Sequence, residues 1–270
     1  MRNPSTTLSL LCLAGLVTVT GTSAAEAAPS STASSSASAA APSGEEMPSG
    51  TLDGWEEVYA QDFTDDAPAG SFRSTYPDID DYGDATPDTS GNGCYDNGEN
   101  VSAHDGLVDV HLRTIDGCPS GGVIAPNNQT SQTYGRYTVR YRADAAEGYG
   151  SAFLLWPASN DWKEGEIDFP ESPFTDPQYM VSFELGTEGT VAYKNHTDVS
   201  WQDWHTATTE WTPDSLKFFI DGEKVGETTD GVPQTPFKWV VQAATNGADV
   251  PDASVEGHLQ IDWMVYSKQA

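Results

Sequence analysis

Two carboxylates share one face of a predicted strand near the middle of the chain. The segment 156–171 reads WPASNDWKEGEIDFPE. Because successive side chains of an extended strand point to opposite faces, Glu166 and Asp168 lie on one face while Ile167 and Phe169 point into a core. Acids placed in this way beside a buried face can act as nucleophiles or as general acids and bases.

A third carboxylate joins this face if the strand contains a bulge. Proline cannot donate a hydrogen bond to the ladder, so Pro170 belongs at an edge or at a bulge. A one-residue bulge at Phe169–Pro170 would return Glu171 to the face that carries Glu166 and Asp168. The sequence therefore predicts three carboxylates in a row along one strand.

Such a row suits the hydrolysis of glycosidic bonds with retention of configuration. The two glutamates can lean together until their carboxyl groups are about 5 Å apart, the separation that retaining glycosidases use. One then attacks the anomeric carbon, while the other protonates the leaving oxygen and later activates water. Asp168 between them can share a proton with the nucleophile. The alternative is a solvated acidic face, since this spacing arises readily by chance in an acidic chain.

Two tryptophans, Trp156 and Trp162, precede the carboxylates closely, and sugar rings stack on flat aromatic faces. The alternative for each is core packing. That alternative fits Trp162 less well, because Trp162 lies in a polar Asn-Asp-Trp-Lys turn. We therefore expect both tryptophans to bind substrate.

The rest of the chain must supply a sheet that positions this strand. In the stretch 134–143, Tyr137, Val139 and Tyr141 alternate with polar residues, which is the pattern of a half-buried antiparallel strand. Asp221-Gly222 between two apolar runs predicts a two-residue hairpin. No window longer than about ten residues holds a helical stripe, so we expect an all-β, two-sheet antiparallel sandwich. Further strands are predicted at 107–112, 151–156, 179–185, 216–220, 239–243 and 259–266.

The charge of the chain excludes whole classes of partner. Its 270 residues include 41 Asp or Glu and 12 Lys or Arg, which gives a net charge of −29. A chain this negative repels nucleic-acid phosphates and anionic membrane surfaces. The excess is spread through loops such as 62–66 and 78–84, as in a solvating surface. It also makes neutral glucans better candidate substrates than sulfated polysaccharides.

Composition divides the chain into three parts. Residues 1–28 have the features of a signal peptide: Arg2, a 14-residue apolar run at 8–21, and small residues at 24–28. The run is shorter than the roughly 20 residues that cross a bilayer, so we expect a secreted, extracellular protein rather than a membrane anchor. Residues 29–50 form a Ser/Ala/Pro-rich flexible linker, and residues 51–270 form one catalytic domain.

Removal of the signal peptide leaves two cysteines, Cys94 and Cys118. In an exported protein they most simply form one disulfide, which would stabilise the fold by about 3 kcal/mol. A metal site is the alternative, but it lacks further cysteines or nearby paired histidines.

The domain resembles glycoside hydrolase family 16, the group of laminarinases, lichenases and agarases. Five landmarks occur in family order: GWEEVYAQDF at 54–63, NVSAHDGLVDVH at 100–111, YGRY at 134–137 followed by AFLLWP at 152–157, WHTATTEWTPDSLKFFIDG at 204–222, and QIDWMVY at 260–266. The resemblance implies a β-jelly-roll (concanavalin-like) sandwich with an open substrate cleft on its concave sheet. It also implies that Glu166 is the nucleophile, Asp168 its assisting partner and Glu171 the general acid/base.

Three further residues are candidates, two of them (Gln242 and Asp262) from the same resemblance. Gln242 resembles a polar position that reaches the cleft floor, and His205 is a candidate cleft residue whose alternative is packing between the sheets. Asp262 resembles a position that binds a structural Ca²⁺ on the convex side in parts of the family; otherwise it belongs to a polar face. No cofactor is implied for catalysis. The segment 180–185 lacks the histidine that many laminarinase-like members carry there, and this departure bears on the substrate.

The leading hypothesis is a secreted, monomeric, endo-acting retaining β-glycanase that cleaves β-1,3- or mixed-linkage glucan. One alternative is a carbohydrate-binding protein on the same fold that has lost catalysis. Another is a transglycosylase that keeps the nucleophile. The intact set of three carboxylates favours an enzyme, since a binding module gains nothing from a row of mutually repelling charges.

Overall fold

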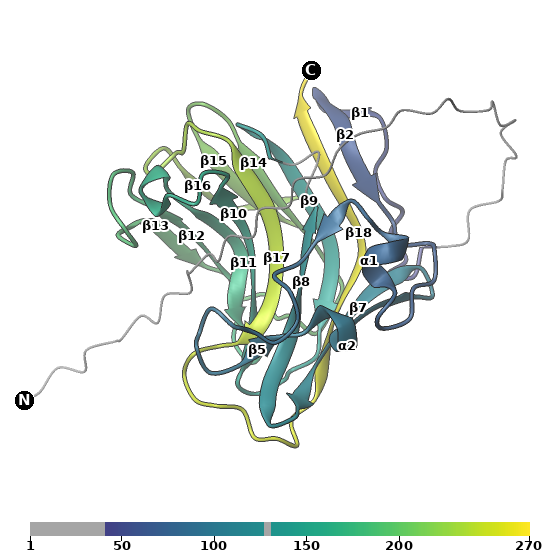
Figure 1. The fold of residues 1–270 in the computed structure, drawn as a ribbon. Helices are drawn as coiled ribbons and strands as arrows, with labels where there is room; N and C mark the ends of the chain where they lie inside the picture. The colour runs from purple at the N-terminus through teal and green to yellow at the C-terminus, as the bar shows by residue number, and fades with distance from the viewer. Residues whose placement is uncertain (1–40, 127–130) are drawn as a thin grey trace, which may run out of the picture.

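The chain folds as two largely antiparallel sheets packed face to face and joined where residues 113–115 pair with residues 118–120 (Figure 1). The structure is a computed structural model, and it describes residues 41–126 and 131–270. The predicted signal peptide and most of the predicted linker lie outside these residues. The two sheets confirm the all-β sandwich expected from the alternating sequence pattern.

The first sheet, called here the cleft sheet, contains the strand predicted to carry the catalytic residues. Each strand pairs with its neighbour in an antiparallel register. A short strand, β5 (Cys94–Tyr95), pairs in parallel with β8 and antiparallel with β4 (Thr86–Pro87). The order across the sheet is β3 (Ile79–Asp80), β8 (Cys118–Pro126), β17 (Phe237–Thr245), β10 (Tyr149–Pro157), β11 (Ile167–Pro173), β12 (Tyr179–Phe183) and β13 (Val191–His196).

The second sheet, called here the outer sheet, covers the opposite side of the core. Its edge strand β2 (Trp55–Gln61) pairs with the last strand of the chain and with β1 (Thr51–Leu52). The other strands run in the order β6 (Val101–His104), β7 (Leu107–Ile115), β18 (Gly257–Gln269), β9 (Gly135–Ala143), β14 (His205–Trp211), β15 (Leu216–Ile220) and β16 (Glu223–Thr228).

The described helices are single turns: α1 (Phe72–Thr75), α2 (Asn97–Asn100) and the 3₁₀ turn η1 (Trp162–Glu164). None of the described helices is long and apolar enough to cross a membrane. All secondary structure that positions the candidate site is therefore strand and turn.

The core lies between the two sheets and is built from the alternating strand positions that the sequence identifies. Tyr137, Val139 and Tyr141 of β9 are buried in it, as predicted. The hairpin between β15 and β16 is also confirmed, because Ile220 pairs with Glu223 across two residues. Both turn residues have positive φ angles, 50° at Asp221 and 80° at Gly222, as this kind of turn requires.

A polar segment before the first strand is anchored on the outer sheet. The amide of Ser43 donates to Asp262 Oδ2 at 3.1 Å, and the indole of Trp263 donates to the Glu45 carbonyl at 3.0 Å. Arg140 Nη1 lies 3.0 Å from Glu45 Oε2, and Arg140 Nε donates to Ser43 Oγ at 3.2 Å. Residues 43–45, assigned to the linker by composition, are therefore in contact with the folded domain.

The predicted disulfide between Cys94 and Cys118 is present, with a Cα–Cα distance of 6.2 Å. It links β5 to the start of β8, next to the parallel pairing of Tyr95 with Gly121. The bond thus fixes the short strand that brings Tyr95 to the cleft sheet.

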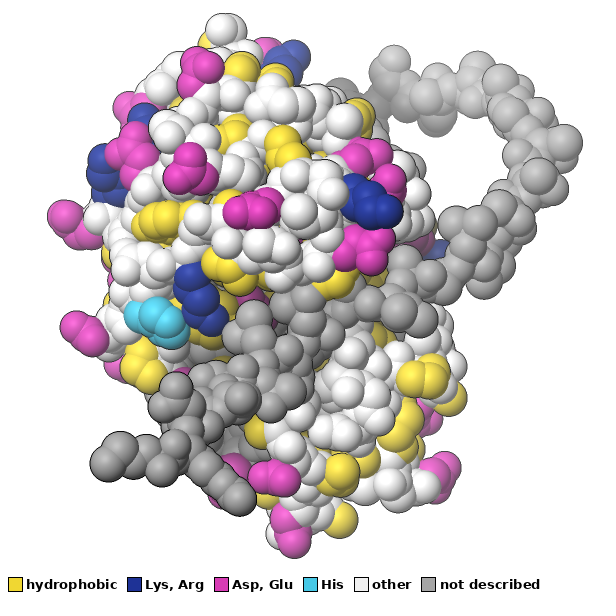
Figure 2. All heavy atoms as spheres, turned by 90° about the vertical axis from the view of Figure 1, so that its left-hand side faces the viewer, with side chains coloured by type: hydrophobic (Ala, Val, Ile, Leu, Met, Phe, Trp, Pro, Cys, Tyr) yellow, Lys and Arg dark blue, Asp and Glu magenta, His cyan; other side chains and the backbone are white. Residues whose placement is uncertain are grey.

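Negative charge is distributed over the surface. Figure 2 shows the face on the left of Figure 1, where Asp and Glu side chains are scattered among uncharged ones. No single acidic patch dominates this face, which supports the interpretation of the charge as a solvating surface.

Candidate active site

The strand predicted to carry the catalytic residues, β11, contains the predicted bulge. Ala152 of β10 pairs with Glu171, but Leu154 pairs with Asp168, so β11 carries one extra residue between the two pairs. The register against β12 shifts at the same place. The extra residue falls at Phe169–Pro170, which are joined by a cis peptide bond. The prediction of a one-residue bulge is confirmed.

The bulge places the three carboxylates on the open face of the cleft sheet. Ile167 and Phe169 lie in the core between the sheets, so the residues that alternate with them face outward. The cross-strand partners of Asp168 and Glu171 belong to a second apolar cluster on that outward face. This cluster consists of Tyr95, Val123, Ala152, Leu154, Trp156, Val240 and Ala244, with Ala125 and Trp162 packed against it.

Glu166 and Asp168 are buried although they carry acid groups. Each side chain is 4% exposed, whereas Glu171 is partly exposed. Carboxylates are rarely buried unless they are paired or protonated. The pair Glu166 and Asp168 meets this requirement by a side-chain hydrogen bond between the two groups.

The surroundings hold Asp168 in its protonated form. Burial raises the pKa of Asp168 well above its usual value, and the charges of Glu166 and Glu171 raise it further. A protonated Asp168 can donate to the Glu166 carboxylate. Its Oδ1 has no hydrogen-bond partner among the described residues.

Glu171 has a pKa suited to exchanging protons near neutral pH. Burial raises its pKa to about 7, against the lowering effect of a hydrogen bond from Tyr179 and of the Lys194 charge. A group with this pKa can serve as an acid in one step and as a base in the next. Glu166 and Glu171 therefore lie in different environments, as the different roles of a nucleophile and a general acid/base require.

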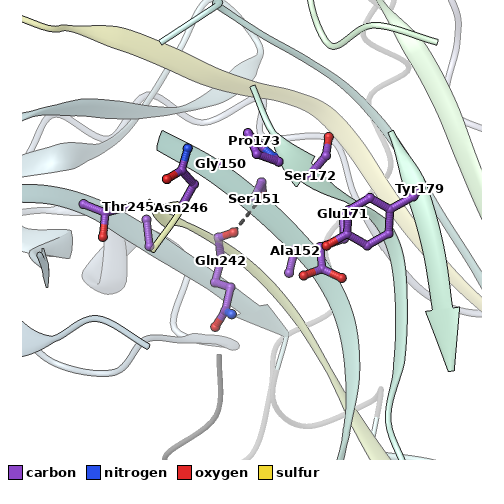
Figure 3. Close-up of a pocket in the computed structure, with 11 residues that line it drawn as sticks. Gly150, Ser151, Ala152, Glu171, Ser172, Pro173, Tyr179, Gln242, Thr245 and Asn246 are labelled. Carbon is purple, nitrogen blue, oxygen red and sulfur yellow. Dashed lines mark hydrogen bonds between the residues drawn. The ribbon is translucent and has the colours of Figure 1, made fainter. Parts of the chain in front are cut away.

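A pocket of about 440 Å³, partly open to solvent, lies beside Glu171 (Figure 3). Glu171 and Tyr179 point toward one another across it, and Gln242 lies on the other side of Ala152. Gln242 is 3% exposed, and its Oε1 accepts a hydrogen bond from the Tyr95 hydroxyl at 3.3 Å. The structure thus brings Gln242 to the floor of the cleft beside the acids.

The two predicted tryptophans lie toward the other end of the row. Trp156 and Trp162 have ring centroids 6.1 Å apart, and Trp162 also contacts Phe183 at 5.9 Å. The indole Nε1 atoms of both are buried without a partner among the described residues. Buried donors of this kind are uncommon in folded proteins.

His205 is not brought to this face. It lies at the start of β14 in the outer sheet, where Nδ1 is 2.7 Å from Asp221 Oδ2. It pairs with Tyr141 of β9, which is a core residue. Its position in the outer sheet gives no support to a role in substrate binding.

No calcium site is shown at Asp262 in the part of the chain that the structure describes. The Asp262 carboxylate accepts from the Ser43 amide, and the Arg140 guanidinium already supplies a positive charge beside it. The described residues include no group of three or more His, Cys, Asp or Glu side chains that could hold a metal ion. Asp262 instead anchors the segment 43–45.

Three residues of the site were not predicted from the sequence: Tyr95, Tyr179 and Lys194. Tyr179 pairs directly with Glu171, and Lys194 pairs with Val181 one strand further out. The only sequence signal for Tyr179 was its place at the start of the strand after the carboxylates. Tyr95 lies in the two-residue strand β5, which is too short to show an alternating sequence pattern.

Comparison with known proteins agrees with this geometry. The model of the glycosyl hydrolases family 16 matches residues 90–265, which include all three carboxylates. The chain belongs to this family. Its resemblance to family 16 is thereby confirmed.

The chain is similar to several β-glucanases and to solved structures of laminarinases. A β-glucanase of Acetivibrio thermocellus is 34% identical over 108 residues, 39% of this chain and 32% of the relative. A β-glucanase of Bacillus subtilis is 28% identical over 156 residues, 53% of this chain and 62% of the relative. The matches thus span about a third to just under two thirds of these relatives. The laminarinase catalytic domain of Thermotoga maritima has a TM-score of 0.65 and 18% identity, with 81% of this chain and 100% of that one covered. That likeness confirms the jelly-roll fold.

Proposed function

We propose that this family 16 chain is an endo-acting retaining glycoside hydrolase that cleaves β-1,3- or mixed-linkage glucan. The observation that carries the proposal is the bulged row of Glu166, Asp168 and Glu171 on the open face of the cleft sheet. The relatives named as β-glucanases support the choice of glucan.

The first step is a displacement at the anomeric carbon. The Glu166 carboxylate attacks this carbon as the glycosidic bond breaks, and Glu171 gives its proton to the departing oxygen. A glycosyl ester forms on Glu166, and Glu171 becomes a carboxylate. Asp168 keeps its proton and donates a hydrogen bond to Glu166, which orients the nucleophile.

The second step returns both glutamates to their starting forms. The Glu171 carboxylate takes a proton from water as that water attacks the anomeric carbon. The ester bond to Glu166 breaks, and its carboxylate is regenerated. Two inversions leave the product in the configuration of the substrate.

The form of the cleft supports attack within a chain rather than at its end. The floor extends from Trp162 past the carboxylates to Gln242 and Asn246, and the pocket is open to solvent. The strong negative charge disfavours polyanionic substrates and leaves neutral glucan as the fitting class.

We also propose that the protein acts outside the cell as a monomer. The predicted signal peptide at 1–28 and the Cys94–Cys118 disulfide support export, because disulfides persist in oxidising compartments.

The test is a panel of laminarin, lichenan, agarose, carrageenan, xyloglucan and chitosan assayed for new reducing ends. Wild type should act on laminarin or lichenan and release oligomers, while Glu166→Gln and Glu171→Gln lose activity by at least about a hundredfold. Activity of Glu166→Gln equal to that of wild type would sink the proposal. Binding of glucan without release of reducing ends would favour a carbohydrate-binding protein, and transfer to an added acceptor sugar would favour a transglycosylase.

A further inference from the structure

The wall of the cleft beside Glu171 is built from side chains of β12 and β13 that the two steps above do not use. Tyr179 pairs with Glu171 on one side and with His196 on the other. Lys194, two positions before His196, has its Nζ atom 3.6 Å from the centre of the Tyr179 ring. Tyr179 therefore lies between the reacting carboxyl and a cation.

Tyr179 makes its polar contact with Glu171 itself. Its side chain points toward the Glu171 carboxyl, and both side chains line the same pocket (Figure 3); the hydrogen-bonding effect of Tyr179 lowers the pKa of Glu171. A donor on one carboxyl oxygen leaves the other oxygen to carry the proton that the leaving group needs. When that proton departs, the bond from Tyr179 becomes a charge-assisted one, which is roughly twice as strong.

Lys194 supplies a positive charge that acts on the carboxylate row. Among the described residues it forms no direct ion pair, and its ammonium group lies over the face of the Tyr179 ring. Its charge nevertheless acts on both Asp168 and Glu171. A cation held over an aromatic ring is attracted by the ring's quadrupole, which fixes both side chains.

The groups that face Glu171 are otherwise acidic or neutral. Its own strand contributes Asp168 and Glu166, and β10 and β17 contribute the uncharged Ala152 and Gln242. From β12 comes Tyr179, and from β13 come Lys194 and His196, whose ring lies 5.4 Å from that of Tyr179. Lys194 is thus the lysine that offsets the acids of this site.

We propose that Tyr179 and Lys194 are positioning residues that orient Glu171 and stabilise its carboxylate during proton transfer. The inference rests on the proposed function, since it concerns the residue that donates the proton. Burial favours the acid form of Glu171, while Tyr179 and Lys194 favour the carboxylate. The balance places its pKa at about 7, where it can act in both steps.

The test compares Tyr179→Phe and Lys194→Met with wild type in pH profiles of kcat/KM on the best glucan of the panel. Each variant removes an influence that lowers the pKa of Glu171, so the alkaline limb should move to higher pH by at least about half a unit. Lys194→Arg should restore most of the wild-type limb. The matched controls Tyr134→Phe, whose hydroxyl bonds Gln234, and the exposed Lys268→Met should leave it in place.

A second readout separates proton donation from folding. Tyr179→Phe should lower kcat on glucan by about tenfold with KM changed less than about threefold. The same variant should slow glycosyl-enzyme formation from a dinitrophenyl β-glucan oligomer by less than about threefold, because the dinitrophenolate leaving group needs no proton. The inference would be overturned if the alkaline limbs of the variants' pH profiles coincide with that of wild type. It would also be overturned if Tyr179→Phe loses the same factor in rate on glucan and on the dinitrophenyl substrate. If wild type is inactive on every glucan or Glu171→Gln is fully active, the proposed function fails instead.

Discussion

Replacing Glu171 with Gln should stabilise the folded protein while it removes activity. Burial raises the pKa of Glu171 from 4.5 to about 7, so its ionisation in the folded state costs free energy. Because the folded pKa lies above the unfolded one, the contribution of Glu171 to stability is fully present below about pH 4.5 and is lost as the pH rises through about 7. Glutamine keeps the shape and can still accept from Tyr179, but it never ionises.

The size of the effect follows from the two pKa values. They differ by about 2.5 pH units, and at 1.36 kcal/mol per unit this corresponds to about 3 kcal/mol when the carboxyl is fully ionised. Glu171 is partly exposed, and solvent screening reduces the expected gain to on the order of 1–2 kcal/mol at pH 8. Loss of the Glu171 charge also makes ionisation of Asp168 easier, which acts in the same direction.

Urea unfolding followed by tryptophan fluorescence at pH 5 and pH 8 measures this difference. Wild type should lose about 1–2 kcal/mol more than Glu171→Gln between the two pH values. The exposed Glu223→Gln on β16 is the matched control and should follow wild type. Parallel pH dependence in wild type and Glu171→Gln would refute the reasoning, because it would mean that burial does not destabilise this carboxylate.

Further predictions concern other parts of the molecule. In wild type, kcat/KM should fall about tenfold per pH unit above about pH 7, as Glu171 loses the proton it donates, and a profile flat to pH 9 would contradict this role. The double variant Cys94→Ser/Cys118→Ser should lose about 3 kcal/mol in urea unfolding, and unchanged stability would show that the closed loop is already ordered in the unfolded chain. Arg140→Met should lose about 1–3 kcal/mol in the same assay, because it releases the segment 43–45 from the outer sheet, whereas a loss equal to that of Lys268→Met would contradict this anchoring. Trp162→Ala should raise KM for glucan by about tenfold with kcat within a few-fold, since it removes a stacking face outside the row of acids, and an unchanged KM would place Trp162 in the core.

The fold and the row of acids could be predicted because both follow from local patterns. The alternation at 134–143 identifies β9, and the dipeptide Asp221-Gly222 identifies the hairpin between β15 and β16. Pro170 indicates a bulge or an edge, because proline cannot donate a hydrogen bond to the ladder, and the register of β11 shows the bulge. Each of these signals lies within a few residues of the feature it predicts.

The parts that were missed depend on register between distant strands. Tyr179 reaches Glu171 only because the bulge shifts the pairing of β11 with β12, and Lys194 reaches Tyr179 only through the pairing of β12 with β13. A change of register by one residue would turn both side chains to the other face. No local pattern determines that pairing.

Two other differences arise from polar packing. The segment 43–45 contains no large hydrophobic residue, so composition predicts a flexible linker. It is held instead by hydrogen bonds to the buried Arg140 and to Asp262. His205 was a candidate cleft residue, but the pairing of β14 with β9 places it in the outer sheet.

Trapping of the glycosyl-enzyme identifies the nucleophile itself. A 2-deoxy-2-fluoro-β-glucan oligosaccharyl fluoride should transfer its glycosyl group to the protein with loss of fluoride, and the fluorine at C2 slows hydrolysis of the ester. Mass spectrometry of the digested protein should then find one glycosyl group on the peptide that contains Glu166, and none in Glu166→Gln. A label on Glu171, or an active enzyme that gives no label and releases products of inverted configuration, would contradict the assignment of the three carboxylates.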